Sequence, residues 1–477
     1  MVDLQVVMST GAHGQLPGAA IEAFKTSIRG RVLCAGDEGY EDARQVWNGL
    51  IDRHPALIAR CTGAADVIDA VNFARTHNLL VSVRGGGHNV AGSAVCDGGL
   101  MIDLSLMKGI HVDPKERTAR AQGGVTWGDL DRETQVFGLA TPGGVVSTTG
   151  IAGLTLGGGL GWLRSKYGLC CDNLLSVDIV TASGELCTAS AEENSDLFWA
   201  VRGGGGNFGV VTSFEYRLYP VGPAVMMCVV MYPVESAPTV LPAWRDFVAT
   251  APDEVSSQAY FWGIPAVEGF PREIWNKPLI IMTAMYAGAA DEGERVLDPL
   301  RRLATPVVDL SGQMPYATAQ TLFDPFLPKG QRYYYFKSTD LARLDDQVID
   351  KAIACAHERP VPSILLAIWH YGGAMRRVSE GGTAFGSRDT PFLFSVDAIW
   401  DDPADSERVI AWSRAQVAAM KPYSSGGLYV NFSGFGEEGE ALVRAAYGAN
   451  YTRLAALKQQ VDPGNLFHMN QNVRPAA

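Results

Sequence analysis

This 477-residue sequence lacks any excess of basic residues and any long apolar run. It has 39 Lys and Arg against 51 Asp and Glu, a formal net charge of −12. Nucleic acids and anionic membrane surfaces attract basic faces, so neither is an expected partner. No stretch approaches about 18 uninterrupted apolar residues, so the sequence predicts no membrane-spanning helix.

Cysteine and histidine are also sparse. The eight cysteines show no Cys-x-x-Cys spacing, and the eight histidines are scattered. We therefore expect reduced thiols and no metal site. Residues 1–16 have neither the basic start nor the apolar core of a signal peptide. These absences predict a cytoplasmic protein, and the length predicts two or three domains.

Glycine, by contrast, is concentrated in one part of the chain. Roughly half of the 53 glycines lie between residues 84 and 209. They form three runs, at Arg84–Asn89, Gly150–Trp162 and Arg202–Gly209. The first run follows a predicted strand, Leu79–Val83, and its free backbone N–H groups suit an anion such as a pyrophosphate. The concentration indicates several loops approaching one extended ligand, although His88 is not a residue that phosphate binding requires.

The third run contains a misleading motif. Gly204–Gly209 satisfies G-x-G-x-x-G, which in a Rossmann fold follows a strand and opens a helix. Here a predicted helix, Ser195–Val201, precedes the motif and a predicted strand, Val210–Leu218, follows it. The P-loop pattern is absent as well. The sequence therefore supports neither a nicotinamide cofactor nor P-loop chemistry.

The glycine runs, together with Phe198-Trp199-Ala200-Val201 ahead of the third, resemble the FAD-linked oxidases of the berberine-bridge-enzyme type, within the vanillyl-alcohol-oxidase superfamily. Tyr429-Val-Asn-Phe432 and Asp462–Asn472 match C-terminal stretches of that family, and the resemblance covers about residues 25–474. It implies an α+β fold. We expect a PCMH-type FAD-binding domain of two α/β subdomains at 1–220, with its core at about 53–220. A substrate domain with a large antiparallel sheet covered by helices would occupy 221–425, and a segment at 426–477 would return to the FAD domain.

Residue patterns predict the elements of the second domain directly. Apolar runs and alternations predict four strands, at Ala224–Tyr232, Pro278–Tyr286, Ile364–His370 and Pro391–Trp400. Between them, helical periodicity predicts helices at Ala237–Thr250, Ala290–Leu303, Asp345–His357 and Asp405–Met420. A further strand is predicted at Leu428–Phe432.

The resemblance also implies the residues that bind FAD. His88 would carry the flavin covalently, because a neutral imidazole nitrogen is nucleophilic near neutral pH. Many relatives add a second bond from a cysteine, but that position falls on Val146, so a single bond is expected. The other predicted FAD-binding residues are Arg84, Gly85, Gly86, Gly87, Asn89, Ser93, Pro142, Gly143, Gly144, Val146, Ser147, Thr148, Gly150, Gly153, Gly157, Gly158, Gly159, Gly161, Trp162, Asn207, Phe208, Gly209, Val210, Tyr429, Asn470 and Asn472.

Three residues are candidates for catalysis. Tyr429 matches a family tyrosine used as a base, but a phenol with a pKa of about 10 needs help to ionise, and the alternative is simple packing. Asp397 is a lone carboxyl in the mostly apolar strand Phe392–Trp400; it is Tyr429's partner, an alternative base, or half of a buried ion pair. His370, with Tyr371 beside it, is a weaker candidate for pocket lining or acid–base work. Tyr333, Tyr334 and Tyr335 either line a pocket or pack on an edge strand.

The expected activity is that of an FAD-dependent oxidase. It would move a hydride from an alcohol or amine carbon of a small molecule, sugar or secondary metabolite to flavin N5, and then reduce O₂ to H₂O₂. Two alternatives stay open. One is a flavin dehydrogenase that uses another acceptor, and the other is a flavin-binding protein without turnover. The oligomeric state is left open.

Overall fold

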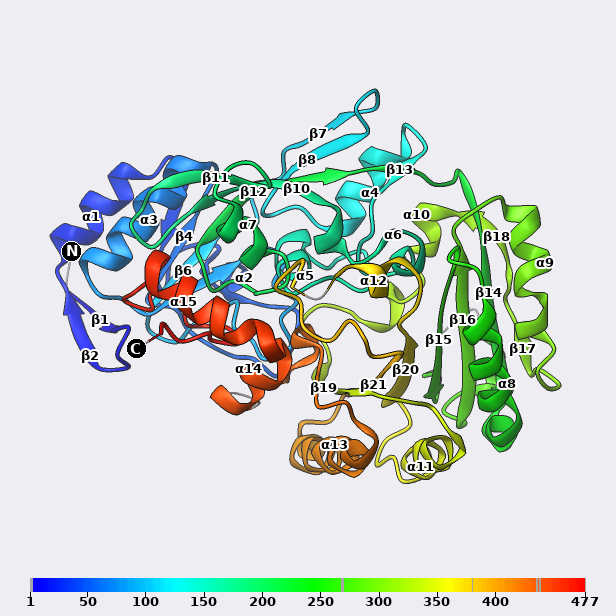
Figure 1. Cartoon of the computed structure of the whole chain (residues 1–477). Helices are drawn as coiled ribbons and strands as arrows, with labels where there is room; N and C mark the ends of the chain where they lie inside the picture. The colour runs from blue at the N-terminus through cyan, green and yellow to red at the C-terminus, as the bar shows by residue number, and fades with distance from the viewer. Residues whose placement is uncertain (1–2, 267–269, 380, 435, 437–438, 477) are drawn as a thin grey trace.

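The computed structural model describes residues 3–266, 270–379, 381–434, 436 and 439–476. The chain folds into two sheet-based units side by side, and a third, larger sheet stands against them (Figure 1). No helix in these described ranges is long and apolar enough to cross a membrane. The structure agrees with the predicted α+β class, because helices and large antiparallel sheets occur together.

The first unit is a four-stranded sheet in the order β3-β4-β6-β5. Strands β4, β6 and β5 are parallel, and their short apolar sequences suit strands that are buried on both faces. Helices α1 and α3 pack together on this sheet, with the rings of Phe24 and Phe73 stacked 4.0 Å apart. The bounds are α1 Gly18–Ser27, β3 Arg31–Leu33, β4 Leu57–Arg60, α3 Ala64–Thr76, β5 Val81–Arg84 and β6 Leu100–Asp103.

The second unit is a five-stranded antiparallel sheet in the order β11-β10-β12-β8-β7. Helix α4 begins with a capping box, in which Thr126 and Asp129 bond each other's backbone N–H groups. Strands β10 and β11 form a hairpin, and the predicted short helix before the third glycine run is present as α7. The bounds are β7 Ile110–Asp113, β8 Thr118–Gln122, α4 Trp127–Gln135, α5 Ile151–Leu156, β10 Leu174–Val180, β11 Leu186–Ser190, α7 Ser195–Val201 and β12 Val210–Arg217.

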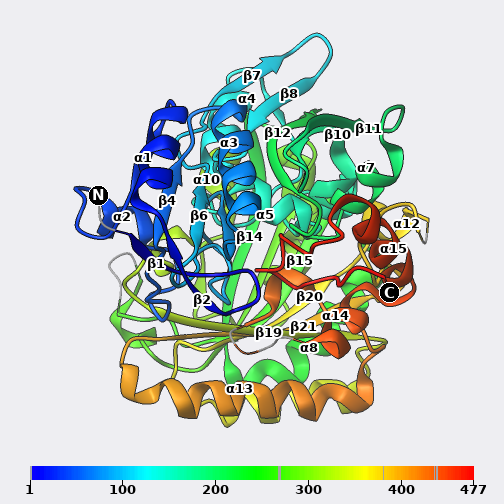
Figure 2. The same cartoon turned by 90° about the vertical axis from the view of Figure 1, so that its left-hand side faces the viewer.

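The third sheet has eight antiparallel strands, β17-β14-β16-β15-β20-β21-β19 with β18 on β14. Four helices cover one face and share one apolar cluster with it, and the other face is turned toward the first two units (Figures 1 and 2). All four predicted helices and four predicted strands form, whereas β15 and β19 were not predicted. The bounds are β14 Ala224–Pro233, α8 Ala237–Thr250, β15 Val255–Trp262, β16 Leu279–Tyr286, α9 Ala290–Arg301, β17 Val308–Asp309, β18 Gly312–Pro315, β19 Tyr333–Leu341, α11 Asp346–His357, β20 Leu365–His370, β21 Phe392–Trp400 and α13 Ser406–Met420.

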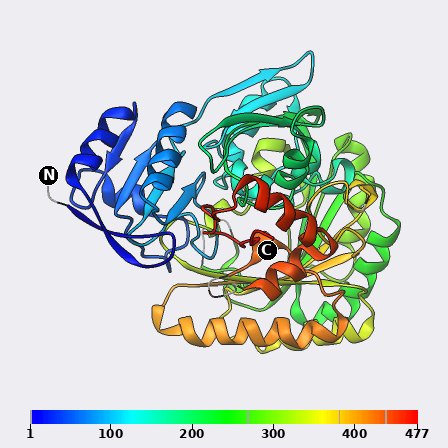
Figure 3. The ribbon, with the colours of Figure 1, turned by 60° about the vertical axis from the view of Figure 1, so that its left-hand side comes forward.

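The end of the chain returns to the second unit. Helices α14 (Glu440–Tyr447) and α15 (Tyr451–Val461) lie beside α7 and share its apolar cluster (Figure 3). Lys458 is fully buried there; its Nζ donates to the carbonyl of Asn207 at 2.6 Å, to Asp462 Oδ2 at 2.7 Å and to the carbonyl of Phe467 at 3.0 Å. One ammonium therefore fixes the chain end to the third glycine run.

One predicted element is wrong. The segment 428–432 is no strand: the backbone turns at Tyr429 into a single 3-10 turn, η7, at Val430–Phe432. The remaining short elements are β1 Leu4–Val7, β2 His13–Leu16, α2 Tyr40–Arg44, β9 Leu139–Ala140, α6 Arg164–Tyr167, η1 Cys170–Asn173, β13 Tyr219–Pro220, η2 Val234–Ser236, η3 Arg272–Ile274, α10 Tyr316–Ala319, η4 Asp324–Phe326, α12 Ala374–Arg377, η5 Pro403–Asp405, η6 Lys421–Tyr423 and η8 Gly448–Asn450.

Candidate active site

A cavity of about 330 Å³ lies where the three sheets meet. Residues from all three glycine runs line one side of it, the free face of the large sheet lines the other, and the segment after α15 closes one end. The wall residues from the large sheet are Gln258, Tyr260, Trp262, Phe336, Leu365, Ala367, Trp369, Asp397 and Ile399. The closing residues are Phe467, Met469, Asn470 and Gln471.

The first glycine run reaches the cavity because its backbone touches the start of the second run. A Cβ on Gly86 would come within 2.3 Å of the Gly150 nitrogen, and a Cβ on Gly150 equally close to the Gly86 nitrogen. Arg84, just ahead, does not line the cavity. Its guanidinium donates to Asp103 at 2.9 and 2.6 Å, so it fixes the start of the loop through a buried ion pair.

His88 stands at the cavity wall, between the ring of Trp47 and two threonines. The two rings are stacked with centroids 4.9 Å apart. Thr148 Oγ1 lies 3.0 Å from His88 Nε2, and Thr149 Oγ1 lies 3.3 Å from Nδ1. Burial, with a smaller contribution from Lys329, lowers the pKa of His88 to about 3. The imidazole is therefore neutral at physiological pH, the form in which a ring nitrogen can act as a nucleophile.

The predicted cofactor residues divide into two groups. Those that line the cavity are Gly85, Gly86, Gly87, His88, Asn89, Ser93, Gly144, Val146, Gly150, Gly153, Gly209, Val210, Tyr429 and Asn470. Those that the cavity lining does not include are Arg84, Pro142, Gly143, Ser147, Thr148, Gly157, Gly158, Gly159, Gly161, Trp162, Asn207, Phe208 and Asn472.

The second group has other contacts. Trp162 is buried in an apolar cluster with Leu163 and Val225. The backbone N–H of Ser147 donates to Asp324 Oδ1 at 2.9 Å, which fastens this loop to η4. Asn207 donates to the carbonyl of Gly204 and accepts from the N–H of Val473. These residues support the walls of the cavity from behind.

Tyr429 is buried, and its phenolic oxygen accepts three hydrogen bonds. The donors are the backbone N–H groups of Gly159 at 3.1 Å and Leu160 at 3.3 Å, and Nδ2 of Asn431 at 2.9 Å. Burial raises the pKa of Tyr429, and these three bonds oppose that effect. The side chain lines the cavity, so the phenol can meet a ligand there.

Asp397 faces the cavity because of its register in β21. It pairs with Phe336 of β19 and Leu365 of β20, and both of these residues also line the cavity. Its alternate neighbours, such as Val396 and Ala398, point into the helix-covered core. Asp397 is 8% exposed, and its Oδ1 has no hydrogen-bond partner in the described chain. Burial raises the pKa of this carboxyl to about 7.

The remaining candidates lie elsewhere. His370 follows Trp369 along β20, so its side chain emerges on the opposite face, where it packs against Phe392. It does not line the cavity and has no contact there for acid–base work. Tyr371 is buried and also outside the cavity lining.

The three consecutive tyrosines do not line the cavity either. The ring of Tyr334 stacks on Trp47 at 3.7 Å, Tyr333 packs near Trp400, and the ring of Tyr335 lies beside Arg414. Of the two alternatives, packing on the sheet is the one that the structure supports.

Sequence reasoning missed the aromatic walls of the cavity. Tyr260 and Trp262 come from β15, which was not predicted, and Phe323 and Phe326 come from the irregular segment around η4. The only available signal was the Tyr260-Phe-Trp262 run, which suits a strand as well as a buried loop.

Comparison with known proteins places these features in a family. Residues 55–190 match the FAD binding domain, and residues 428–474 match the berberine and berberine-like segment. An FAD-linked oxidoreductase of Dictyostelium discoideum is 31% identical over 459 residues, 95% of this chain and 97% of the relative. The (R)-6-hydroxynicotine oxidase of Paenarthrobacter nicotinovorans is 33% identical over 478 residues, 95% of this chain and 98% of the relative.

Solved structures agree in fold. A crystal structure of 6-hydroxy-D-nicotine oxidase from Arthrobacter nicotinovorans has a TM-score of 0.85 at 31% identity, covering 94% of this chain and 99% of that one. A chitooligosaccharide oxidase has a TM-score of 0.83 at 24% identity, covering 96% of this chain and 100% of that one, and shows the fold alone. The resemblance carried by the glycine runs is confirmed: the chain belongs to the berberine-bridge-enzyme-like family and is an FAD-dependent oxidoreductase.

Proposed function

We propose that this protein is an oxidase that carries FAD on one covalent bond to His88 and oxidises an alcohol or amine carbon of an apolar small molecule. The observation that carries the proposal is one cavity lined by His88, Tyr429 and Asp397. These supply a nucleophile for a tether and two groups able to take a proton. The carboxyl is buried with an unpartnered oxygen, which is costly unless a ligand uses it.

The residues present fit FAD. Backbone of Gly85–Asn89, Gly205 and Gly206 would lie along the cofactor, because glycines there leave room for close approach. Asn470 lines the cavity and its buried Oδ1 has no partner among the described residues, so it can accept from a ligand N–H. When bound, FAD would accept a hydride from the substrate and pass two electrons to O₂, giving H₂O₂.

His88 would be the only covalent anchor. The new bond would join one imidazole nitrogen to the 8α-methyl carbon of FAD, and the two displaced hydrogens would leave with O₂ as H₂O₂. The neutral ring supports this role, because a protonated imidazole has no free electron pair. Val146 lines the cavity at the position where many relatives have a cysteine, and its side chain cannot form a thioether.

Tyr429 or Asp397 would remove the substrate proton. Both line the cavity, and the pKa of Asp397 at about 7 suits a group that changes protonation near the working pH. Tyr429 is our first choice, because its oxygen already accepts three hydrogen bonds that favour the phenolate.

The cavity walls indicate an apolar substrate. Ten of the described lining residues are Phe, Tyr or Trp: Trp47, Tyr260, Trp262, Phe323, Phe326, Phe336, Trp369, Tyr429, Phe432 and Phe467. Asp397 is the one Asp, Glu, Lys or Arg among the described lining residues. An oligosaccharide needs many hydrogen-bonding partners, so these walls favour a secondary metabolite with an apolar or aromatic body.

The first test asks whether flavin stays with the acid-precipitated, denatured protein. We expect a yellow pellet from the native chain and a colourless one from His88→Ala. A yellow His88→Ala pellet would mean a second bond, and a protein without flavin in pellet or supernatant would refute the proposal.

The second test screens alcohols and amines for anaerobic bleaching of the flavin and for H₂O₂ in air. Bleaching followed by slow reoxidation in air would instead identify a dehydrogenase. Failure of every substrate to bleach the flavin would favour a binding protein without turnover.

A further inference from the structure

Within the second glycine run, Gly150 and Gly153 line the cavity, whereas Gly157–Gly159 do not line it and instead pack around Tyr429 and Asn431. A Cβ on Gly157 would come within 2.1 Å of Asn431 Oδ1, so glycine leaves the space that this amide fills. Gly158 and Gly159 have φ of +114° and +90°, and a Cβ on either would strike Phe385 at 2.6 Å or Cys170 at 2.3 Å. Both positions therefore require glycine, and their left-handed backbone turns successive N–H groups toward one point.

That point is the phenolic oxygen of Tyr429. Two backbone N–H groups, from Gly159 and Leu160, and the amide of Asn431 donate to it. The second N–H of Asn431 donates to the carbonyl of Leu154 at 3.1 Å, so the orientation of the amide is fixed. We call Gly158–Leu160 together with Asn431 the anion cradle.

The number of donors matches an ionised phenol. A neutral phenolic oxygen has two acceptor positions and one proton to donate. Here three donors converge on it, and no acceptor for its own proton lies within hydrogen-bond distance among the described residues. A phenolate has no proton to place and accepts all three bonds, and hydrogen bonds to a charged group are the stronger kind.

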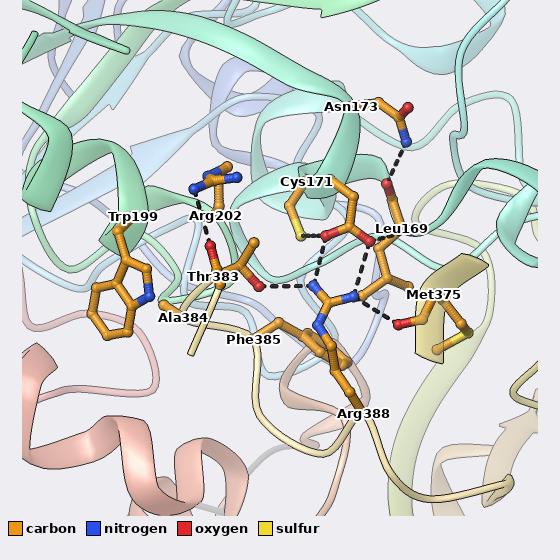
Figure 4. A network of polar contacts seen from close by, with 12 residues as sticks. Leu169, Cys171, Asn173, Trp199, Arg202, Met375, Thr383, Ala384, Phe385 and Arg388 are labelled. Carbon is orange, nitrogen blue, oxygen red and sulfur yellow. Dashed lines mark hydrogen bonds and ion pairs between the residues drawn. The ribbon is translucent and has the colours of Figure 1, made fainter. Parts of the chain in front are cut away.

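The cradle is held from behind by a second layer. The carbonyls of Gly158 and Gly159 accept from the N–H groups of Cys171 and Cys170 at 2.9 and 3.0 Å. These cysteines begin η1, whose Asp172 forms a buried pair with Arg388 at 2.9 and 2.6 Å. Figure 4 shows this guanidinium also reaching Met375 and Thr383. These contacts hold the N–H groups in position before the phenol of Tyr429 loses its proton. Less free energy is then needed to reorganise them when the negative charge forms.

Few other titratable groups face the phenol. Cys171 and Tyr371 are the nearest, and burial raises the pKa of both well above the ordinary value, so both are neutral. Tyr371 is in turn faced by Arg164 and the buried Asp340. The rings of Phe385 and Phe432 pack against Tyr429, and Asp397 lines the same cavity. Among the residues that the structure describes, no cation packs against Tyr429, so the cradle itself must supply the stabilisation.

We propose that the anion cradle stabilises the phenolate of Tyr429, and that Asn431 is a positioning residue that sets the pH at which Tyr429 can accept a substrate proton. This inference rests on the proposed function, in which Tyr429 is the base. It also assigns Gly157–Gly159 of the second glycine run a role different from cofactor binding.

The test places 3-fluorotyrosine at position 429 and follows its fluorine resonance by NMR as the pH of the flavin-loaded, substrate-free protein is raised. Asn431→Leu removes one donor at similar volume. We expect ionisation to move up by about one to two pH units, since a hydrogen bond to a charged group contributes about 1.5–3 kcal/mol. Asn72→Leu is the control, because that amide lies on α3, where its oxygen accepts from Arg75, and it should leave the titration unchanged.

Asn431→Asp provides a second variant of nearly the same shape, which replaces the donor with a carboxylate and should move ionisation further upward. An unchanged fluorine titration in both Asn431 variants would overturn the proposal. The titration needs no turnover, so a protein that oxidises nothing would defeat the proposed function while leaving the cradle testable. With a substrate in hand, the acid limb of kcat/KM should move by the same amount as the fluorine titration.

Discussion

Asp131 offers a quantitative test of how burial acts on this structure. It lies on α4 with 2% of its surface exposed, and its Oδ2 accepts from Gln320 Nε2 at 3.0 Å. The same nitrogen donates to the carbonyl of Gly144, a residue of the cavity wall, so this contact joins α4, the segment after α10 and the cavity. No cation among the described residues pairs with the carboxyl, and burial raises its pKa from 3.8 to about 7.

The sign follows from proton binding. Between about pH 4 and 7 the folded protein keeps this carboxyl protonated, while the unfolded chain has lost the proton. The free energy of unfolding therefore falls as pH rises through that window, and the loss is complete above pH 7. A shift of about 3 units at about 1.4 kcal/mol each gives about 4 kcal/mol.

Asp131→Asn removes this pH dependence while keeping the shape of the side chain. We expect the difference in unfolding free energy, variant minus native, to grow by about 4 kcal/mol between pH 4 and 8 in urea titrations followed by tryptophan fluorescence. Other buried groups titrate in the same way in the variant and in the native protein, so their contributions to this difference in unfolding free energy cancel. Asp196→Asn, at a carboxylate 73% exposed, should run parallel to the native chain. If Asp131→Asn also ran parallel, the reasoning from burial would be refuted.

Three further predictions concern the site. Tyr429→Phe should keep its flavin but slow anaerobic flavin reduction by about 10²–10⁴-fold, and an unchanged rate would exclude Tyr429 as the base. If Asp397 is the base instead, the rate in the native protein should rise as pH passes about 7, where this carboxyl becomes ionised, and Asp397→Asn should lose the rise, measured by stopped-flow absorbance. Lys458→Met leaves Asp462 buried without its cation and should cost about 3–5 kcal/mol of stability and lower the fraction of the protein that acquires flavin. A variant as stable as the native chain by denaturant titration would show the pair to be dispensable.

Sequence patterns predicted an element correctly where a single physical principle determines its structure. Ser195–Val201 and Ala237–Thr250 form helices with the predicted bounds, since their apolar periodicity agrees with tertiary packing. Strand β15 was missed because all eight of its residues are buried, including Ser256, Ser257 and Gln258, so no alternation marks it. In the sequence alone these polar residues suggest a loop. In the folded protein, neighbouring strands supply their partners.

The residues of the candidate site were also only partly predictable from the sequence. Glycine spacing located chain segments that line the cavity, but it could not tell what each run approaches: Gly157–Gly159 bend around a side chain that lies 270 residues later in the sequence. Alternation along β20 predicts that His370 and Trp369 lie on opposite faces of the sheet, but it does not predict which face borders the cavity. His370 was therefore assigned to the wrong face. Such choices depend on contacts distant in sequence.

The buried ammonium of Lys458 has a consequence for biosynthesis. Asn470 and its neighbours close a cavity whose opposite wall contains His88, and Lys458 holds that closing segment in place. A nascent chain that has emerged only as far as the large sheet thus has His88 but an open-ended cavity. If the flavin is attached to His88 as we propose, attachment should wait until the chain beyond residue 470 has been made, which makes it a late maturation step.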